Sequence, residues 1–184
     1  MYSSEGDIQI IIQGCLKNDR RAQEELYKRF YPAMMALCLR YLRDRQDALE
    51  VLNDALLKVF KQMGRFDPAK AALYTWMRTI VINTALDWLR KQKTLRHREM
   101  LPDEEETGGV DNEAIAKLSG DELLGIIRRL PTTSRTVFNL YVIDGYAHRE
   151  IGALLSISEG TSRCHLNDAR KQLKTILNLV EPKT

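Results

Sequence analysis

The chain has 184 residues, of which 44% are hydrophobic and 29% charged, and its formal net charge at pH 7 is +3. This apolar content excludes an intrinsically disordered protein, and the length suits one compact domain or two small ones. No run of 18 apolar residues and no basic-then-apolar N-terminus occurs, so we expect neither membrane insertion nor a secretory signal.

The three cysteines are scattered and form no C-x-x-C pair. This spacing argues against a disulfide framework or a zinc site and favours the reducing cytoplasm. We expect two buried thiols and one exposed thiol.

Apolar residues recur every three or four positions in the first half, which predicts helices. We expect a short helix capped by Asp7, then a longer one after Asp19 that is kinked or broken at Pro32. Asp44 should begin a third helix, and Gly64 should end it. The predicted buried face of this third helix consists of Ala48, Val51, Leu52, Ala55, Leu56, Val59 and Met63.

Residues 65–71 are predicted to form a loop, and a fourth helix is expected over 72–92. We place Trp76 in the core, because its side of the helix borders an apolar stripe. The helix ends in the basic run 90–98, which contains no carboxylate. The predicted buried stripe consists of Leu73, Met77, Ile80, Val81, Thr84 and Trp88.

Composition changes sharply between residues 102 and 113, where acidic residues surround Gly108 and Gly109. A charge-rich segment without apolar periodicity is typical of a flexible linker. We therefore predict an all-α chain with two small helical domains, over 1–98 and 119–184, joined by a flexible acidic linker over 99–118. An acidic run repels the phosphates of DNA. It would therefore keep the linker away from DNA, or cover the basic surface when no partner is bound.

Helices are also predicted in the second half. The apolar stripe of the first consists of Leu123, Ile126, Ile127 and Leu130 and ends at Pro131, and the next helix should stop near Gly145. The strongest motif follows over 148–163: a short helix, a turn, and a final helix that begins near Glu159. Gly152 and Ala153 are small enough to let the two helices cross closely, and Ser158 can cap the second.

This motif predicts a helix-turn-helix domain whose second helix enters the major groove of DNA. Arg163 is the expected reader of a guanine, because a guanidinium makes two hydrogen bonds to one base edge. We expect the histidines to be solvated or to face phosphates. The structural alternative is a helical bundle with a solvated charged face. The remaining candidates for DNA contact are Arg149, Ser158, Thr161, Ser162, His165, Asn167, Arg170 and Lys171.

Two sets of residues, one in each half of the chain, carry a resemblance to a known family. In the second half they are Leu130-Pro131-x-x-x-Arg135-x-Val137-Phe138-x-Leu140, Gly145, Glu150-Ile151, Ile157-Ser158-x-Gly160-Thr161 and Ala169-Arg170-x-x-Leu173. In the first half they are Asp47-Ala48, Glu50 to Asp54, Phe60, Phe66, Trp76, Asn83, Asp87 and Leu89-Arg90. On these residues the chain resembles extracytoplasmic-function sigma factors in both halves, over roughly residues 23–177. The second half alone is also similar to a LuxR-type response-regulator domain, and the first half decides between the two.

The resemblance implies a sigma factor that guides RNA polymerase to promoters. The spacing of the cysteines and histidines predicts no metal site, and we expect no cofactor. The C-terminal domain would bind the minus-thirty-five element, and the family implies an anti-sigma partner. The clamp helices of the largest polymerase subunit would bind Glu50, Asn53, Asp54 and Leu57, and the flap of the second subunit is also an expected contact. The minus-ten element would be contacted by Arg65, Phe66, Tyr74, Arg78, Asn83, Asp87 and Arg90.

Several positions depart from the family pattern. Asn53 stands where glutamine is usual, Ala147 lacks the hydroxyl that caps the first helix of the motif, and Ser156 replaces a common glycine. Together with unusual residues at Cys164, His165 and Asp168, these departures leave the minus-thirty-five sequence open.

Two other functions compete with this interpretation. A dimeric helix-turn-helix repressor or activator would bind DNA tightly without polymerase. An enzyme is disfavoured, because the sequence has no Gly-rich phosphate loop, Ser-His-Asp arrangement or metal cluster.

Overall fold

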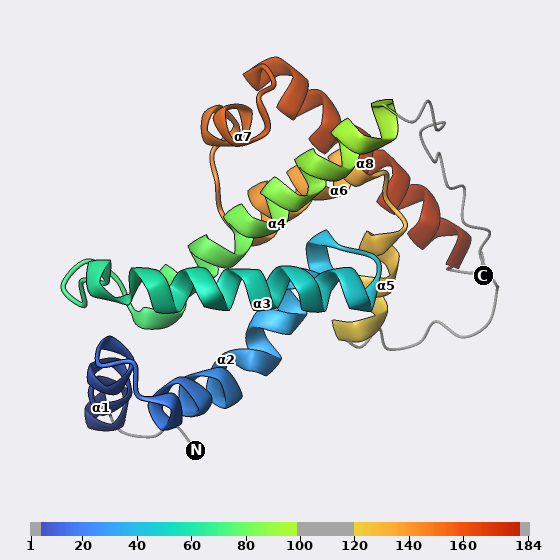
Figure 1. Ribbon diagram of the computed structural model, residues 1–184. Coiled ribbons are helices and arrows are strands. Elements are labelled where there is room, and N and C mark those ends of the chain that lie inside the picture. Colours follow the sequence, from blue (N-terminus) through green and yellow to red (C-terminus); the bar gives the residue numbers. More distant parts are fainter. Residues whose placement is uncertain (1–4, 99–119, 181–184) are drawn as a thin grey trace. The chain divides into compact units, whose positions relative to one another are not determined.

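The computed structural model describes residues 5–98 and 120–180, and every regular element in these ranges is helical (Figure 1). Contacts divide the chain into an N-terminal unit, Met1–Arg90, and a C-terminal unit, Lys91–Thr184. The all-α class and the two helical domains are therefore confirmed. The predicted linker over 99–118 lies outside the described residues, so the domain boundaries stay a prediction.

The N-terminal unit begins with two helices packed against each other, α1 (Glu5–Leu16) and α2 (Arg20–Tyr41). They approach closely at Gly14, where an added Cβ would overlap that of Ala22. Asp19 caps α2 as predicted, its carboxylate accepting the N–H of Arg21 at 2.8 Å. The prediction for Asp7 was wrong: α1 begins at Glu5, and Asp7 lies inside its first turn.

α2 continues through Pro32 as one helix, so the break considered at this position does not occur. Pro32 is exposed, and its missing N–H removes only one hydrogen bond of the helix. Buried side chains on both sides of the proline hold the helix in place, and they are Leu26, Phe30, Met34, Met35, Leu37, Cys38 and Tyr41.

α3 (Arg45–Gln62) packs on α2 and begins as predicted. The Asp44 carboxylate accepts the N–H groups of Gln46 at 2.6 Å and Asp47 at 3.1 Å. All seven residues of its predicted buried face are buried. Gly64 does not end the helix: α3 stops at Gln62, and Gly64 lies in the 3₁₀ turn η1 (Met63–Arg65) without a positive φ.

α4 (Leu73–Arg98) extends beyond the predicted end at residue 92, because the whole basic run over 90–98 is helical. Four residues of the predicted buried stripe are buried, namely Leu73, Met77, Val81 and Thr84. The buried face also includes Ile82, Ala85 and Leu86, whereas Ile80 and Trp88 are only half-buried. Trp76 was predicted to lie in the core, but it is also only half-buried. None of the described helices combines the length and the apolar content needed to cross a bilayer.

The C-terminal unit contains α5 (Gly120–Arg128), α6 (Thr132–Phe138), the π-helical turn η2 (Asn139–Ile143), α7 (His148–Leu155) and α8 (Glu159–Val180). Helices α5, α6 and α7 all pack against α8. Ile126, Ile127 and Leu130 are buried as predicted, whereas the side chain of Leu123 lies outside the described residues. Gly145 follows η2 with φ +78°, as expected for a stop near this residue.

Candidate polymerase and nucleic-acid interfaces

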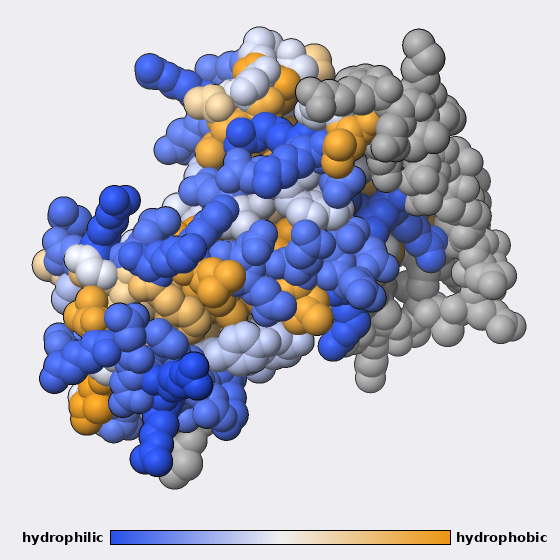
Figure 2. Space-filling view, in the orientation of Figure 1, coloured by the Kyte–Doolittle hydropathy of each residue, from blue (hydrophilic) through white to orange (hydrophobic). Residues whose placement is uncertain are grey.

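The four residues predicted to bind polymerase lie on one exposed face of α3. Glu50, Asn53, Asp54 and Leu57 recur at helical spacing, and all four are exposed. Leu57 is 55% exposed, and Leu49, which sequence reasoning missed, adds a second exposed leucine. We call these five residues the α3 surface. Figure 2 shows apolar side chains among polar ones over α3.

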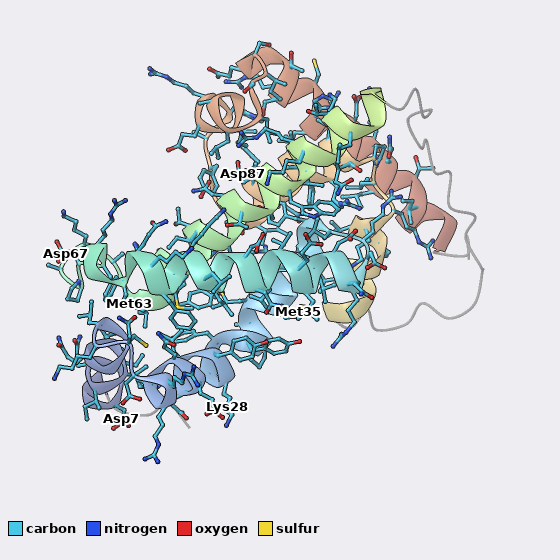
Figure 3. The ribbon with its side chains drawn as sticks, in the orientation of Figure 1. Asp7, Lys28, Met35, Met63, Asp67 and Asp87 are labelled. Atoms are coloured by element: carbon cyan, nitrogen blue, oxygen red, sulfur yellow. The ribbon has the colours of Figure 1, made fainter. Side chains whose placement is uncertain are left out.

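The loop between η1 and α4 is held by a local turn. The Asp67 carboxylate accepts the N–H of Ala69 at 3.0 Å, and Figure 3 places Asp67 at the end of the unit where this loop lies. Phe66 is half-buried against Trp76, with ring centroids 5.4 Å apart. Tyr74 is 44% exposed, so it is the aromatic ring of this region that is more accessible to an unpaired base.

Asp87 lies on α4, where Figure 3 labels it, and its ion pairs form part of a polar cluster that joins α4 to α3. Its carboxylate is 3.0 Å from the Arg90 guanidinium and 3.9 Å from the Lys58 ammonium. The same ammonium donates a hydrogen bond of 3.1 Å to the hydroxyl of Thr84. A carboxylate would repel DNA phosphates, so this geometry suits Asp87 to orienting Arg90 rather than to contacting DNA itself.

The other minus-ten candidates lie in η1, which contains Arg65, and along α4, which contains Arg78, Asn83 and Arg90. Arg65, Asn83 and Arg90 are exposed, and Arg78 is half-buried. Sequence reasoning missed Lys58, whose position opposite Asp87 depends on how α3 and α4 pack.

The turn of the helix-turn-helix and the cap of its second helix are formed as the sequence predicts, but Ala153 departs from the prediction. An added Cβ at Gly152 would lie 2.8 Å from the carbonyl oxygen of Ile157, so the close crossing requires glycine there. Ser158 caps α8 by accepting the N–H of Thr161 at 2.9 Å. Ser156 adopts the left-handed conformation, with φ +56°, in the turn. The exception is Ala153, which is exposed and takes no part in the crossing.

Ala147 begins α7 without a side-chain cap, as expected from its missing hydroxyl. The Glu150 carboxylate accepts the N–H of Ala147 at 2.7 Å, which supplies one of the two hydrogen bonds of a capping box.

Two candidates on α8 lie on its inward side. Ser162 is fully buried, and its hydroxyl oxygen lies 2.9 Å from Nδ1 of His148. His165 is half-buried, with its Nδ1 3.3 Å from the hydroxyl of Ser134. Both face inward because they share the side of α8 that carries the buried Leu166. The exposed candidates are Arg149, Ser158, Thr161, Arg163, Asn167, Arg170 and Lys171.

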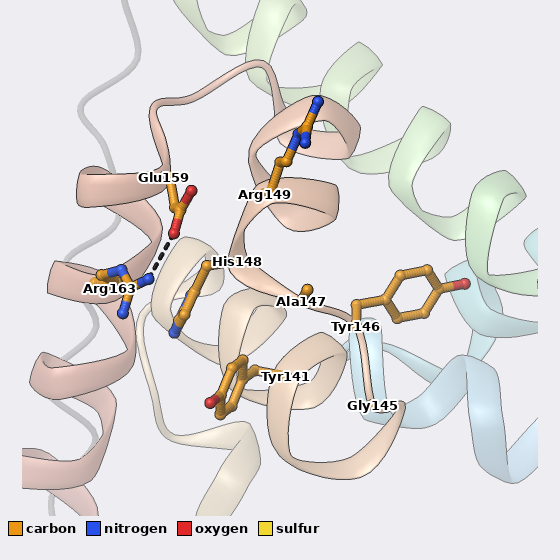
Figure 4. A pocket seen from close by; sticks show the side chains of 8 residues that line it. All are labelled: Tyr141, Gly145, Tyr146, Ala147, His148, Arg149, Glu159 and Arg163. Atoms are coloured by element: carbon orange, nitrogen blue, oxygen red, sulfur yellow. Dashed lines mark hydrogen bonds and ion pairs between the residues drawn. The ribbon is translucent and has the colours of Figure 1, made fainter.

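An open hollow of about 550 Å³ lies beside the start of α8 (Figure 4). Arg149 of α7 and Arg163 of α8 both contribute to its wall, together with Tyr141 and His148. Arg163 makes an ion pair with Glu159 one turn earlier, and this hydrogen-bonded pair holds the pKa of Glu159 below its ordinary value. The ion pair is exposed and screened by solvent, so a DNA base can compete for Arg163.

The prediction that His148 is solvated or faces phosphates was wrong, because this residue is buried. Only 8% of it is exposed, and its ring stacks on Tyr141 with centroids 4.3 Å apart and planes 19° apart. Loss of hydration lowers the pKa of His148, and the positive charges of Arg163 and Arg170 lower it further, while Glu159 opposes them.

The described residues contain no group of three His, Cys, Asp or Glu side chains arranged to hold a metal ion. The cysteines are distributed as predicted, with Cys15 and Cys38 buried and Cys164 exposed. Burial raises the pKa of Cys38 to about 12, so this thiol stays protonated at neutral pH.

Two family descriptions match the chain. Sigma-70 region 2 matches residues 26–94, which carry all of α3 and most of α2 and α4. Sigma-70, region 4 matches residues 120–173, which carry α5 to α7 and most of α8.

Curated relatives match over nearly the whole length. The chain is 25% identical over 189 residues to the RNA polymerase sigma-H factor of Pseudomonas aeruginosa, covering 96% of each chain. It is 27% identical over 186 residues to the ECF RNA polymerase sigma-E factor of Escherichia coli K12, covering 95% of this chain and 94% of the relative.

Among solved structures, the fold is similar to the sigma factor RpoE of Bartonella quintana, crystallised with the anti-sigma factor NepR. The TM-score is 0.55 at 18% identity, and the match covers 86% of this chain and 98% of the other. A second match is CnrH in complex with the cytosolic domain of CnrY, with a TM-score of 0.50 at 20% identity over 94% and 97% of the two chains.

Proposed function

Because the chain belongs to the extracytoplasmic-function family of sigma factors, and so directs promoter-specific transcription initiation by RNA polymerase, we propose a division of this work between its two units. The family is non-enzymatic, so the chain acts by binding. The N-terminal unit binds core polymerase and the minus-ten element, and the C-terminal unit binds the minus-thirty-five element.

The α3 surface is the proposed docking site for the clamp helices of the largest polymerase subunit. The observation that carries this proposal is an exposed apolar centre, Leu57 with Leu49, beside the polar groups of Glu50, Asn53 and Asp54. Apolar area supplies affinity in such interfaces, while charged groups at the rim speed encounter and exclude wrong partners.

Asp54→Arg tests the docking site. We expect the affinity for core polymerase to fall by roughly tenfold or more, because charge reversal next to Leu57 sets the wrong charge against the partner. Affinity is measured with the full chain and purified core polymerase, and far-UV circular dichroism checks the fold. Asp7→Arg on α1 makes the same charge change at another exposed position and should leave affinity unchanged. Equal affinities of the wild type and the Asp54 variant would remove α3 from the interface.

Strand opening at the minus-ten element exposes bases that the loop and α4 can hold. Extruding a base costs a few kcal/mol, which stacking and hydrogen bonds in a protein pocket offset. Tyr74 is suited to stacking by its exposure, and Asn83 to a base edge, whereas Arg65, Arg78 and Arg90 are suited to phosphates. Asp87 contributes by holding Arg90 in place.

The exposed start of α8 is the proposed reader of the minus-thirty-five element. Thr161, Arg163 and Asn167 are exposed in the half of the helix that enters the groove in this motif. Arg149, Arg170 and Lys171 are exposed cations suited to the flanking phosphates, which fix the register of the helix on the duplex.

Arg163→Ala tests base reading. Initiation should fall at promoters with the matching upstream element, by a factor equivalent to roughly 1–3 kcal/mol, and change little at promoters without it. Run-off transcription with core polymerase on both promoter classes measures the difference. Arg129→Ala removes an exposed arginine after α5 and serves as the matched control. The same fractional loss on every upstream sequence would contradict base reading by Arg163.

Two further expectations rest on the family. We propose that the chain acts in the cytoplasm, where core polymerase and DNA lie. An anti-sigma factor is also an expected partner, and both similar solved structures contain a second protein, named as an anti-sigma factor in one of them.

A further inference from the structure

The recognition helix α8 is fastened to two different helices by hydrogen bonds from its inward face. The Ser162 hydroxyl lies 2.9 Å from Nδ1 of His148 in α7. One turn later, Nδ1 of His165 lies 3.3 Å from the Ser134 hydroxyl in α6. Arg163, the proposed base reader, directly follows Ser162 on the same helix. A rotation of α8 that moves the Ser162 hydroxyl therefore also moves the guanidinium of Arg163.

The contact between His148 and Ser162 has little freedom. Ser162 is fully buried, and His148 is 8% exposed. The imidazole is stacked on Tyr141 of η2, with centroids 4.3 Å apart, which fixes the plane of the ring (Figure 4). The close backbone crossing at Gly152 also fixes the distance between α7 and α8.

Burial of an apolar stripe sets only roughly how a helix is rotated about its own axis, because apolar burial is non-directional. A hydrogen bond depends on distance and angle, so it can select one rotation. A side chain at the helix surface lies about 5–6 Å from the axis, so a rotation of about 10° moves it by about 1 Å. That displacement is enough to spoil a bidentate contact with a base edge.

We propose that His148 and Ser162 are positioning residues: their buried hydrogen bond sets the rotation of α8 and thereby determines which upstream base Arg163 reads. Neither residue touches DNA in this arrangement. The inference rests on the proposed role of α8 in reading the minus-thirty-five element.

The test uses the full chain with core polymerase on a pool of templates in which the upstream element is randomised. Sequencing the transcribed templates gives the base preference at each upstream position. Ser162→Ala removes the hydroxyl, and His148→Phe keeps a ring against Tyr141 but lacks the nitrogen. Each should reduce, by roughly tenfold, the preference at the position that Arg163→Ala relaxes. The double variant should lose no more than either single variant, because both remove the same hydrogen bond.

His148→Asn is the conservative variant, since its amide can occupy the place of Nδ1 and keep the hydrogen bond. It should retain the preference that His148→Phe loses. The preference at the minus-ten element should be unchanged in all variants, which serves as an internal control. Far-UV circular dichroism checks that each variant is folded, and His148→Phe decides the matter if Ser162→Ala does not fold.

The outcomes separate this inference from the proposed function. If Arg163→Ala relaxes one upstream position but the folded Ser162 and His148 variants keep the wild-type preference there, the inference is wrong and the proposed function stands. A general loss of transcripts without a change in preference would likewise reduce the pair to a structural role. If Arg163→Ala changes no upstream preference, the proposed function itself fails, and the inference fails with it.

Discussion

At the scale of single residues, the C-terminal unit depends on polar side chains that are buried and paired. Arg135 is 2% exposed, and its guanidinium donates a hydrogen bond of 3.1 Å to the carbonyl oxygen of Arg128 at the end of α5. His148 and Ser162 form a second buried contact of this kind. Leaving a buried polar group without its hydrogen-bond partner lowers the free energy of unfolding by about 1–3 kcal/mol. Loss of either of these two contacts should therefore destabilise the unit.

The buried His148 predicts that the C-terminal unit loses stability in acid. Its pKa lies below the ordinary value of 6.5 because burial and the neighbouring Arg163 and Arg170 disfavour the charged ring. The unfolded chain therefore binds more protons in this pH range. The contribution of His148 to stability is complete above about pH 6.5 and is lost as the pH falls toward the lower pKa of the folded state.

Thermal unfolding between about pH 5 and 8, followed by far-UV circular dichroism, measures this effect. His148→Phe should remove the part of the pH dependence that is due to the imidazole. Both tryptophans, Trp76 and Trp88, lie in the N-terminal unit, so their fluorescence should report an unfolding transition that the substitution leaves unchanged. Identical pH profiles for the wild type and the variant by circular dichroism would show that His148 is not the group responsible.

At the scale of elements, two close approaches between neighbouring segments occur at glycines, which have no side chain. Gly14 permits the approach of α2 to α1, and Gly152 permits the approach of the turn before α8 to α7. At Gly152 the nearest atom to an added Cβ is a backbone oxygen, 2.8 Å away, which cannot rotate aside as a side chain can. The steep crossing that presents α8 therefore depends on this glycine.

Gly152→Ala should destabilise the C-terminal unit by about 1–3 kcal/mol, because the two helices must move apart. The usual gain of up to about 1 kcal/mol from replacing glycine by alanine in a helix offsets only part of this cost. Gly125→Ala in α5 is the matched control, since an added Cβ there meets nothing within 4 Å. Denaturant unfolding measures both variants, and we expect the control to gain stability. A stabilised Gly152 variant would contradict the close crossing.

At the scale of the whole molecule, each unit has its own core, and each carries a separate proposed binding surface. Buried residues of α2, α3 and α4 form one core, and those of α5 to α8 form the other. The two promoter elements are separate stretches of DNA, so two small domains that each bind one of them suit a sigma factor.

The predicted linker over 99–118 can be tested by limited proteolysis. A glutamate-specific protease should cut first after Glu104, Glu105, Glu106 or Glu113, and yield two fragments that each remain helical. Glutamates within helices, such as Glu24 and Glu50, should resist, because cleavage there requires local unfolding. First cuts within α2 or α3 would place the domain boundary elsewhere.

Much of the fold is encoded locally and was therefore predictable from sequence. Asp19, Asp44 and Ser158 cap helices through hydrogen bonds to backbone groups two or three residues away, which a sequence pattern displays directly. The buried face of α3 follows from the period of its apolar residues, since 3.6 residues per turn place them on one side. The exposed side of α3 is the complement of that face, so Glu50, Asn53, Asp54 and Leu57 were predictable for the same reason, although Leu49 was missed.

The rest depends on contacts between residues far apart in the chain. Ser162 was expected in the groove, but α8 is rotated so that it faces His148, 14 residues earlier. The pairing of Asp87 with Lys58 likewise depends on how α3 and α4 pack. One residue on a helix spans about 100° of rotation, so small differences in packing decide whether a side chain meets DNA or the protein core. The sequence by itself determined where most helices lie, the caps at Asp19, Asp44 and Ser158, and the family, because these depend on local patterns. Only the tertiary structure decided which side chains of α8 remain available for binding, because that depends on residues far apart in the chain.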